Sequence, residues 1–473
     1  ILFFTYKEPP DPHAPEAPQD HGDSAVLDLQ TMTTSRPATL TAGGAAAPQL
    51  ANLFCAGQAF LPDGRLLVAG GEREKPSVRG LHVFTPDGAG PGSWRPVGQL
   101  PAGRWYPTCA TLRDGRVIIV AGDNWTPGSR VANKTFAVYD PVSGLQPPRP
   151  APFVGEGGYA TYPFVALLPN GKLLVHLGTR TRFLDTATLT FDPLVVEAAA
   201  RPGRNGRTYH LQGTCVLLPL SPVSAPAYRA RVMVFGGGGA TPTGIRTPAT
   251  ATCEILDTGA ATPQWQPTPP MTRPRVMPDA VLLPDGTVFV GNGSSTGVAD
   301  NGANPVYEAE LYDPATNTWR VLDQMRVPRL YHATALLLPD GRVMTAGTDS
   351  MWNPDPFHES QLRVELFSPP YLFRGGRPTI GGAPAEVGYG ATFAITTSDP
   401  EQVAAVALLR AGSCTHSFNS DQRHVALAIV ARSPATLTVQ APPNGNVAPP
   451  GHYLLFVLNG DGVPSEGRFV RLR

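Results

Sequence analysis

Cysteine is scarce in this 473-residue sequence, and its count is odd. The five cysteines are Cys55, Cys109, Cys215, Cys253 and Cys414. An odd count leaves at least one sulfur without an intramolecular disulfide partner, and that sulfur is a candidate for reactive chemistry. Cys215 and Cys253 are compatible with a disulfide or with two buried thiols, and Cys414 is interpreted as a packing residue.

An excess of charge of one sign is also missing. Lys and Arg total 37, Asp and Glu total 37, and no basic block occurs in the chain. Nucleic acids and anionic membranes attract proteins through clustered positive charge, so neither is expected as a partner.

Long apolar runs are absent as well. No run approaches the roughly 18 residues that a membrane-spanning helix requires, so no transmembrane segment is expected. The apolar start at residues 1–4 is too short for the core of a signal peptide, and any leader is expected to have been removed or to lie outside this numbering. No His-Glu-x-x-His motif occurs, so a hydrolase-like propeller enzyme lacks support.

Glycine and proline, in contrast, are abundant, with 50 and 53 residues. Both residues interrupt helices and favour turns, so this composition predicts many short strands. The chain is too long for one ordinary core, which indicates either two domains or one large repeat with an appendage.

One pattern recurs through the first three quarters of the chain: an apolar strand, a tight turn, a second apolar strand and a glycine cluster. Its turns are Asp63-Gly64, Asp114-Gly115, Asn170-Gly171, Asp285-Gly286 and Asp340-Gly341, with a divergent sixth copy within residues 215–239. Such dipeptides supply the positive-φ positions that two-residue hairpin loops require. The period of about 50 residues is typical of kelch propellers, and it predicts about seven blades in this part of the chain.

The predicted fold is therefore all-β. A seven-bladed kelch-type β-propeller is expected over residues 1–367, followed by an immunoglobulin-like β-sandwich over residues 368–473, where the repeat gives way to short alternating strands. A strand around residues 24–29 is expected to close the seventh blade by pairing with strands near the end of the propeller, since closure hides sheet edges.

Potential metal ligands stand where the hairpins begin. Cys55 precedes the first hairpin, Tyr106 precedes the second, and the pair Tyr331-His332 precedes a later one. Inner strands of a propeller start near one end of its central channel, so these side chains are expected to converge there. His416, in a loop of the predicted sandwich, is positioned to join them. Taken singly, each residue has an ordinary structural interpretation, and only the combination indicates a metal site.

The same residues carry a resemblance to a known family. The order Cys, Arg-x-Tyr, Tyr-His and then Gly-Ser-x-Thr-His-x-x-Asn-x-Asp-Gln-Arg, from Gly412 to Arg423, resembles the copper radical oxidases, the family of galactose oxidase and glyoxal oxidase. The closing run Pro-Pro-Gly-x-Tyr-x-Leu-Phe-Val-Leu-Asn is similar to that family too, so the resemblance covers nearly the whole chain.

The resemblance implies one copper ion and a thioether radical cofactor. It implies that Tyr106 is an equatorial tyrosinate joined to Cys55, and that Tyr331 is an axial tyrosine. It further implies that His332 and His416 are the imidazole ligands. Two imidazoles and a phenolate suit Cu(II) with one position left open for substrate.

The implied activity is that of an oxidoreductase using O2 and releasing hydrogen peroxide. Its expected substrate is a primary alcohol or a small aldehyde of the glycolaldehyde or glyoxal type. Tyr331 is expected to take the substrate proton as general base, while a hydrogen atom passes to the Tyr106 radical and copper accepts the second electron. A galactose or carbohydrate alcohol oxidase is the alternative, although Arg180, Arg207 and Arg246 match a sugar-binding arginine too loosely.

Two tryptophans are expected around the radical. Galactose oxidases stack a tryptophan over the thioether, and Trp125 stands one residue away from the corresponding place. It is therefore either that shield or an unrelated propeller residue. Trp105, in Arg-Trp-Tyr-Pro, is similar to the glyoxal oxidase side of the family.

A second class of function is a non-catalytic kelch propeller that binds polysaccharide or protein. A binding module has no reason to retain Cys55, Tyr106, Tyr331, His332 and His416 together, which favours the enzyme. Peroxide chemistry predicts an extracellular or cell-surface location, where a surface glycan is a conceivable partner. A monomer is expected.

Overall fold

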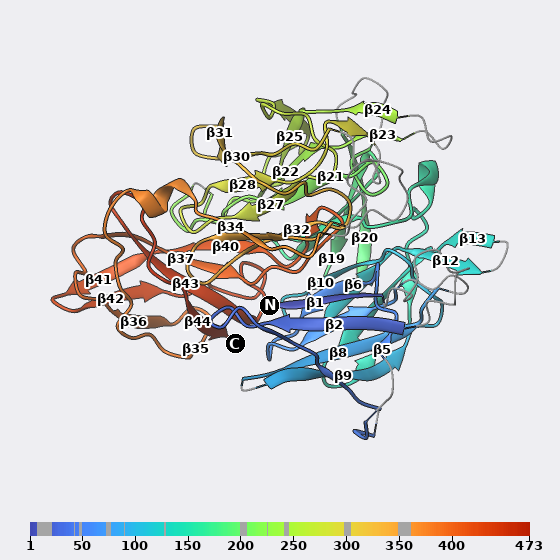
Figure 1. The fold of residues 1–473 in the computed structure, drawn as a ribbon, viewed down its shortest axis with the longest axis horizontal. Coiled ribbons are helices and arrows are strands. Elements are labelled where there is room, and N and C mark those ends of the chain that lie inside the picture. Colours follow the sequence, from blue (N-terminus) through green and yellow to red (C-terminus); the bar gives the residue numbers. More distant parts are fainter. Residues whose placement is uncertain are drawn as a thin grey trace. The chain divides into compact units, whose positions relative to one another are not determined.

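The structure is a computed structural model, and it describes the chain apart from residues 7–20, 42, 47–49, 72–76, 89, 127–128, 199–205, 225, 241–245, 298–303 and 349–360. Strands dominate this described part, and its helices are the short 3-10 turns η1 (Glu156–Gly158) and η2 (Pro370–Phe373) (Figure 1). Neither turn has the length or hydropathy to cross a membrane. The predicted all-β fold is confirmed.

The chain forms two compact units, Ile1–Pro163 and Phe164–Arg473. The first contains an N-terminal sheet and two sheets of the predicted repeat. The N-terminal sheet consists of β1 (Leu2–Tyr6), β2 (His21–Leu27), β3 (Thr34–Ser35) and β5 (Leu50–Ala51). Repeat sheet 1 consists of β6 (Gly57–Phe60), β7 (Leu66–Ala69), β8 (Gly80–Asp87) and β9 (Gly90–Gln99), with β4 (Ala38–Thr39) beside β9.

Repeat sheet 2 consists of β10 (Thr108–Thr111), β11 (Val117–Val120), β14 (Thr135–Asp140), β15 (Gly144–Leu145) and β16 (Arg149–Pro150). A separate hairpin, β12 (Asp123–Thr126) and β13 (Ser129–Ala132), is inserted between β11 and β14. The first strands of the two sheets, β6 and β10, lie side by side. Leu67 and Ile119 are fully buried in the core between them, and burying one such side chain contributes about 1.5–3 kcal/mol.

The strand around residues 24–29 was predicted to close the propeller by pairing with strands near its end, and this pairing was predicted wrongly. Strand β2 pairs with β1 on one edge and with β3 and β5 on the other. Its register joins Val26 to Leu2 and to Ser35. Both edges are thus occupied by neighbouring N-terminal strands, and no edge is left for the end of the propeller.

The second unit contains four more repeat sheets. Repeat sheet 3 is β17 (Phe164–Leu167), β18 (Lys172–Leu177), β19 (Arg180–Asp185) and β20 (Thr190–Glu197). Repeat sheet 4 is β21 (Gly213–Leu217), β22 (Arg231–Gly236), β25 (Cys253–Asp257) and β26 (Trp265–Thr268). Repeat sheet 5 is β27 (Asp279–Leu282), β28 (Val288–Gly291), β30 (Glu308–Asp313) and β31 (Thr318–Gln324), and repeat sheet 6 is β32 (Thr334–Leu337), β33 (Val343–Ala346) and β34 (Glu365–Phe367).

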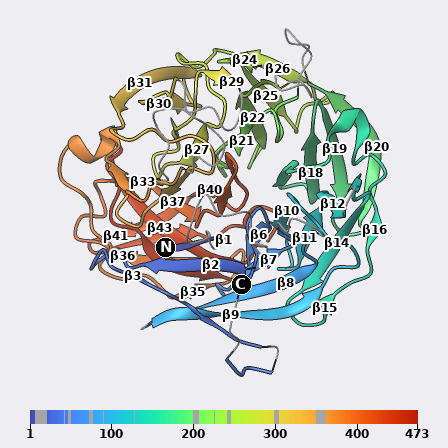
Figure 2. The same ribbon diagram turned by 45° about the vertical axis from the view of Figure 1, so that its right-hand side comes forward.

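Figure 2 shows these four sheets following one another in chain order, and their first strands β17, β21, β27 and β32 are neighbours in that order. A small sheet of β23 (Gly238–Ala240), β24 (Arg246–Ala249) and β29 (Thr296–Gly297) lies outside the repeat. Side-by-side first strands are the arrangement that a propeller requires.

The remaining strands form the predicted C-terminal sandwich. One sheet is β35 (Glu386–Val387), β44 (Arg468–Leu472), β43 (Gly451–Asn459), β37 (Val403–Arg410) and β40 (Arg423–Leu427), in that order. The other is β36 (Thr392–Thr396), β42 (Thr436–Gln440) and β41 (Ile429–Ser433). A short hairpin of β38 (Cys414–Thr415) and β39 (Phe418–Asn419) leaves the first sheet before β40. Leu454 and Phe456 of β43 pack into one core with Val288 and Val290 of repeat sheet 5.

The predicted hairpin turns are present. In each Asp-Gly or Asn-Gly turn the side chain accepts the N–H of the residue two positions later, at 2.9–3.2 Å. The glycines have φ of 83–90°, a conformation that costs other residues energy. Cys215 and Cys253 are buried thiols, and the Cys253 thiol donates to the Ala251 carbonyl at 3.4 Å.

Candidate functional site

A left-handed residue stands at the entrance to the first strand of every repeat sheet. The six residues are Cys55, Tyr106, Tyr162, Gln212, Met277 and His332, with φ between 38° and 61°. Residues other than glycine adopt this conformation only when their surroundings enforce it, at a cost on the order of 1–3 kcal/mol. The repeat therefore builds one equivalent, strained position per sheet, and three of the predicted site residues occupy such positions.

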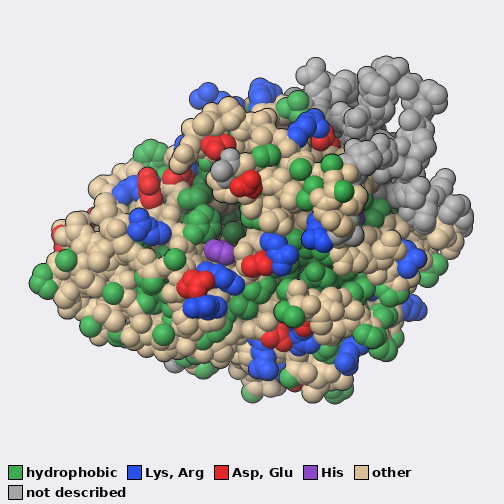
Figure 3. Space-filling model, turned by 90° about the horizontal axis from the view of Figure 1, so that it is seen from below, with side chains coloured by type: hydrophobic (Ala, Val, Ile, Leu, Met, Phe, Trp, Pro, Cys, Tyr) green, Lys and Arg blue, Asp and Glu red, His purple; other side chains and the backbone are tan. Residues whose placement is uncertain are grey.

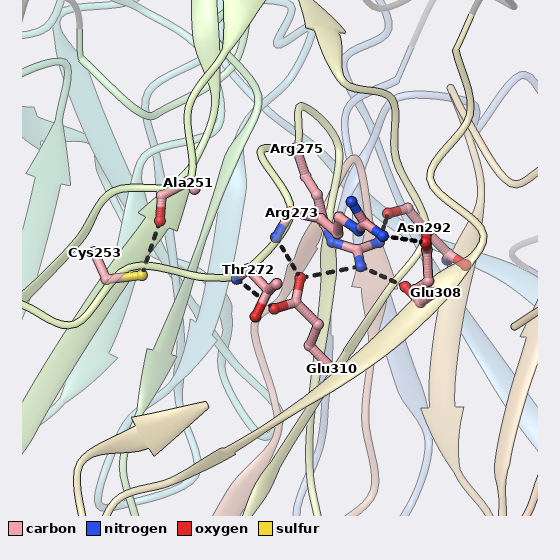
Figure 4. A network of polar contacts seen from close by, with 8 residues as sticks. All are labelled: Ala251, Cys253, Thr272, Arg273, Arg275, Asn292, Glu308 and Glu310. Atoms are coloured by element: carbon pink, nitrogen blue, oxygen red, sulfur yellow. Dashed lines mark hydrogen bonds and ion pairs between the residues drawn. The ribbon is translucent and has the colours of Figure 1, made fainter. Parts of the chain in front are cut away.

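Buried arginines anchor four of these entrances. Each guanidinium donates to a carbonyl at the end of the second strand of its sheet or one residue beyond it: Arg104 to Ala121, Arg207 to Gly236, Arg275 to Asn292 and Arg329 to Gly347. Three of them also pair with a glutamate of the third strand: Arg207 with Glu254, Arg275 with Glu310 and Arg329 with Glu365. Figure 4 shows the Arg275 network, in which Asn292, Glu308 and Glu310 accept from one guanidinium.

These anchors fix the backbone that leads into each left-handed residue. Burial lowers the pKa of Arg104 to about 10 and also lowers that of Arg275, and both side chains stay cationic at neutral pH. Arg207 is fully buried and bound to Glu254 at 2.9 Å. It is therefore a structural residue and is not available to hold a sugar. Arg180 pairs with Glu197 at 2.7 Å, and both side chains are exposed.

In the first unit, Cys55 and Tyr106 lie on two loops joined by their main chains. The Tyr106 N–H donates to the Cys55 carbonyl at 3.0 Å, and both residues are 4% exposed. Gly57 permits this approach, because a Cβ there would lie 2.7 Å from the Pro107 carbonyl oxygen.

Tyr162 braces the same two loops. Its N–H donates to the Tyr106 carbonyl at 2.8 Å, and its hydroxyl donates to the Ala56 carbonyl at 3.0 Å. Its ring centroid lies 5.1 Å from that of Tyr106. Tyr162 was not among the predicted site residues, although its place at the start of the third hairpin was a usable signal.

The ring of Tyr106 is covered by Trp105. The two centroids are 4.3 Å apart and the planes differ by 27°. Trp125 stacks on Trp105 at 5.4 Å and 20°. Trp105, rather than Trp125, therefore lies next to the Tyr106 ring, and Trp125 is one ring further out.

In the second unit, the two predicted imidazole ligands meet. The Nε2 atoms of His332 and His416 lie 3.1 Å apart, with ring planes at 80°. Two nitrogens bound at about 2 Å to one ion, at right angles, are separated by about 3 Å, so the pair fits a shared metal. Burial, with His332 and His210 nearby, lowers the pKa of His416 well below its usual value. The imidazole is therefore neutral, as a ligand must be.

His416 is also oriented by its neighbour. Its Nδ1 lies 2.7 Å from the hydroxyl of Thr415, so Nε2 is the nitrogen directed at His332. The loop that carries it is tied down by Arg423, which donates to the carbonyls of Val447, Leu167 and Asn446 at 2.6–2.9 Å. Asp421 pairs with Arg410 at 3.6 Å. These contacts anchor the loop that carries His416.

Tyr331 lies beside both histidines. Its ring centroid is 3.6 Å from that of His332 and 5.6 Å from that of His416. Its hydroxyl shares a hydrogen bond of 2.5 Å with the hydroxyl of Tyr209, a residue that the sequence analysis missed. Tyr209-His210 is a second Tyr-His pair ahead of a hairpin, and that repetition was the signal.

A buried acid lies behind the His416 loop. The Cys414 thiol donates to Asp279 at 3.1 Å, and the Asn292 amide donates to its other oxygen at 2.6 Å. Burial raises the pKa of Asp279 to about 7. Cys414 therefore has a hydrogen-bonding role in addition to the packing role predicted for it.

The surface drawn in Figure 3 carries acidic and basic side chains intermixed, without a continuous patch of either sign. This distribution agrees with the zero net charge of the chain. It offers no electrostatic footprint for a polyanion on that face.

Comparisons with known proteins point in one direction. A family model described as "Glyoxal oxidase N-terminus" matches residues 45–371, and one described as "Galactose oxidase-like, Early set domain" matches residues 377–472. The protein "Aldehyde oxidase GLOX" of Vitis pseudoreticulata is 33% identical, covering 96% of this chain and 86% of the relative. The "Galactose oxidase" of Gibberella zeae is 27% identical, covering 89% of this chain and 61% of the relative.

A solved structure that resembles nearly the whole chain is known. It is a fungal alcohol oxidase of the AA5 family in complex with copper, with a TM-score of 0.74, 23% identity, and coverage of 96% of this chain and 91% of that one. At this identity the likeness shows a shared fold.

Proposed function

Because the chain belongs to the glyoxal oxidase family of copper radical oxidases, we propose that its own copper centre is built from Cys55, Tyr106, Tyr331, His332 and His416. Membership confirms the predicted family, the oxidoreductase class acting on alcohols or aldehydes with O2, and the copper and Cys-Tyr thioether cofactor. The assignment of individual residues is our proposal. The observation that carries it is the 3.1 Å separation of the His332 and His416 Nε2 atoms beside Tyr331.

In this proposal His416 is contributed by the sandwich domain of residues 368–473, and the other four residues by the propeller of residues 1–367. Copper and the thioether radical together supply the two one-electron acceptors that oxidation of an alcohol requires. Cys55 and Tyr106 supply the thioether, supported by their main-chain hydrogen bond and their burial. Trp105 shields the Tyr106 ring from solvent by stacking on it.

Tyr331 acts as the general base. Held as the phenolate, its oxygen would take the proton of the substrate hydroxyl, and the Tyr209 hydroxyl would donate to that oxygen through the 2.5 Å hydrogen bond. The Tyr106 oxygen receives the hydrogen atom from the substrate carbon. In the neutral His416, a tautomer with its proton on Nδ1, the nitrogen beside the Thr415 hydroxyl, would leave the Nε2 lone pair for the metal.

We propose small aldehydes of the glycolaldehyde or glyoxal type, or simple primary alcohols, as substrates. The identity to an aldehyde oxidase, 33%, exceeds that to a galactose oxidase, 27%. Arg207 is committed to Glu254, which weakens the carbohydrate alternative. Release of peroxide favours an extracellular or cell-surface location.

Intact-mass spectrometry before and after aerobic copper loading tests the proposed centre. Thioether formation removes two hydrogen atoms, and the peptides carrying Cys55 and Tyr106 should then be recovered as one species. Cys55→Ser should bind copper without this loss, and Cys109→Ser, at another buried thiol, is the control. Copper binding without any loss of mass in the unmodified protein would refute the radical centre. Peroxide release with glycolaldehyde, methylglyoxal and galactose then ranks the substrates.

A further inference from the structure

The hairpin β12–β13 holds both the backbone and the ring of Trp105. Trp105 and Asp123 exchange two backbone hydrogen bonds of 2.8 Å. Trp125 lies opposite Arg130 in the hairpin register. The Trp125 N–H donates to the Ser77 hydroxyl at 2.7 Å, and the Ser77 N–H donates to the Trp125 carbonyl at 2.8 Å. The hairpin is thus fixed at the stack of three aromatic rings.

A cation is placed against the middle ring of this stack. The guanidinium of Arg130 lies 4.9 Å from the centroid of Trp105. The Asp123 carboxylate, 5% exposed, holds the guanidinium through an ion pair. A cation over an indole stabilises the neutral ring through its quadrupole. It also repels the positive charge that the ring would carry after losing an electron, so Arg130 makes Trp105 harder to oxidise.

The surroundings of the Trp105 indole nitrogen also disfavour oxidation of this ring. The nitrogen is buried and has no hydrogen-bond partner among the residues that the structure describes. An oxidised indole is a strong acid that is stabilised when a neighbour accepts its proton. None of the described residues offers this route to a radical cation on Trp105.

We propose that Arg130 and Asp123 confine the oxidising equivalent to Tyr106 by making Trp105 resistant to oxidation. This inference rests on the proposed function, because it requires Tyr106 to carry the radical. The reaction that Arg130 and Asp123 would suppress is the transfer of one electron from the Trp105 ring to the Tyr106 radical. It would leave a Tyr106 phenolate and a Trp105 radical cation, with no bond formed or broken.

A second electron transfer, from Trp125 to Trp105, would carry the oxidising equivalent one ring further from the site. The rings, with centroids 4.3 and 5.4 Å apart, are close enough for both electron transfers. Arg130 and Asp123 act through Trp105 and touch neither substrate nor the reacting atoms. They are positioning residues: Arg130 acts on Trp105 through its positive charge, and Asp123 acts by holding the Arg130 guanidinium in place.

The test is the lifetime of the radical without substrate. The copper-loaded protein, with thioether formation verified by mass, is oxidised with ferricyanide under argon, and the radical is followed by its optical absorption and by electron paramagnetic resonance. Arg130→Gln is expected to shorten the lifetime about tenfold, because the repulsion that opposes electron loss from Trp105 is removed. If O2 is then admitted as the oxidant, peptides of this variant that contain Trp105 or Trp125 should gain oxygen as the radical decays.

Two variants serve as controls. Arg130→Lys keeps the charge and should retain most of the lifetime. Arg116→Gln removes an arginine that is paired with Asp114 at 2.8 Å in the same unit, and it should leave the lifetime unchanged.

The outcomes separate the two proposals. A radical that forms with its thioether intact but decays equally fast in Arg130→Gln and in the unmodified protein would overturn the confinement and leave the proposed function standing. Equal losses of lifetime in Arg130→Lys and Arg130→Gln would overturn an electrostatic role. Absence of the mass loss in the unmodified protein would overturn the proposed function and the confinement together.

Discussion

Replacing Glu310 by Gln is expected to destabilise the fold far more than the same change at Glu308, two residues earlier on β30. Both carboxylates pair with an arginine, Glu310 with Arg275 at 3.2 Å and Glu308 with Arg273 at 2.7 Å. The shorter pair is the exposed one: the Arg273 and Glu308 side chains are 50% and 19% exposed, whereas those of Arg275 and Glu310 are 0% exposed. The distances therefore predict that the Glu308 pair contributes more to stability, whereas burial predicts that the Glu310 pair does.

Burial decides the expected magnitude. Glu310 also accepts the backbone N–H groups of Thr272 and Arg273, at 2.6 and 3.1 Å. An amide at this position leaves Arg275 as an uncompensated buried cation and presents a donor to other donors. Breaking a buried pair from one side costs about 3–5 kcal/mol, whereas an exposed pair contributes about 0–1 kcal/mol. The two variants should thus differ by about 2–5 kcal/mol in the free energy of unfolding.

Urea unfolding, followed by tryptophan fluorescence, measures this difference. The double replacement Arg275→Met with Glu310→Leu removes both charges and should recover part of the loss, because no buried charge is left unpaired. Equal losses in Glu308→Gln and Glu310→Gln would refute the reasoning that burial, and not separation, sets the energetics of these pairs.

Three further results are expected. Tyr209→Phe removes a hydrogen bond to Tyr331 that contributes about 0.5–1.5 kcal/mol, so kcat/KM should fall roughly 2–10-fold at unchanged copper content; an unchanged value would contradict the role of Tyr209. Burial raises the pKa of Asp279 from 3.8 to about 7, so its contribution to stability is lost as pH rises from about 4 to 7. Asp279→Asn should remove that slope from Tm against pH, and parallel profiles would disprove it. Gly57→Ala places a Cβ 2.7 Å from the Pro107 oxygen and should reduce thioether yield by mass, while Gly88→Ala, with nothing within 4 Å, should not.

Local chemistry explains which parts of the fold were predictable. An Asp-Gly turn is determined by the dipeptide itself, and turns such as Asp63-Gly64 and Asp340-Gly341 lie where the sequence places them. Closure by β2 was predicted wrongly, because strand pairing depends on which edge is nearest in space. The turn dipeptides carry no information about that choice.

The anchoring role of the four buried arginines was not predicted from the sequence, for a related reason. Arg104 and Arg275 precede their strands by four residues, Arg329 by five and Arg207 by six, so no fixed spacing marks them. Their shared role appears only when each guanidinium is seen to reach the end of the second strand. The order of stacking, Tyr106 on Trp105 on Trp125, likewise depends on ring orientations that the sequence does not encode locally.

The left-handed residue at each entrance has a consequence for how such a protein can change. The same backbone geometry is occupied by Cys55, Tyr106, Gln212, Met277 and His332, so it tolerates a thiol, a phenol, an amide, a thioether and an imidazole. The conformation is enforced by the main chain and, at four entrances, by an arginine anchor, not by the side chain that it displays. The side chain at each entrance can thus be replaced during evolution, and the site can gain or lose a chemical group while the backbone of the surrounding sheet is kept.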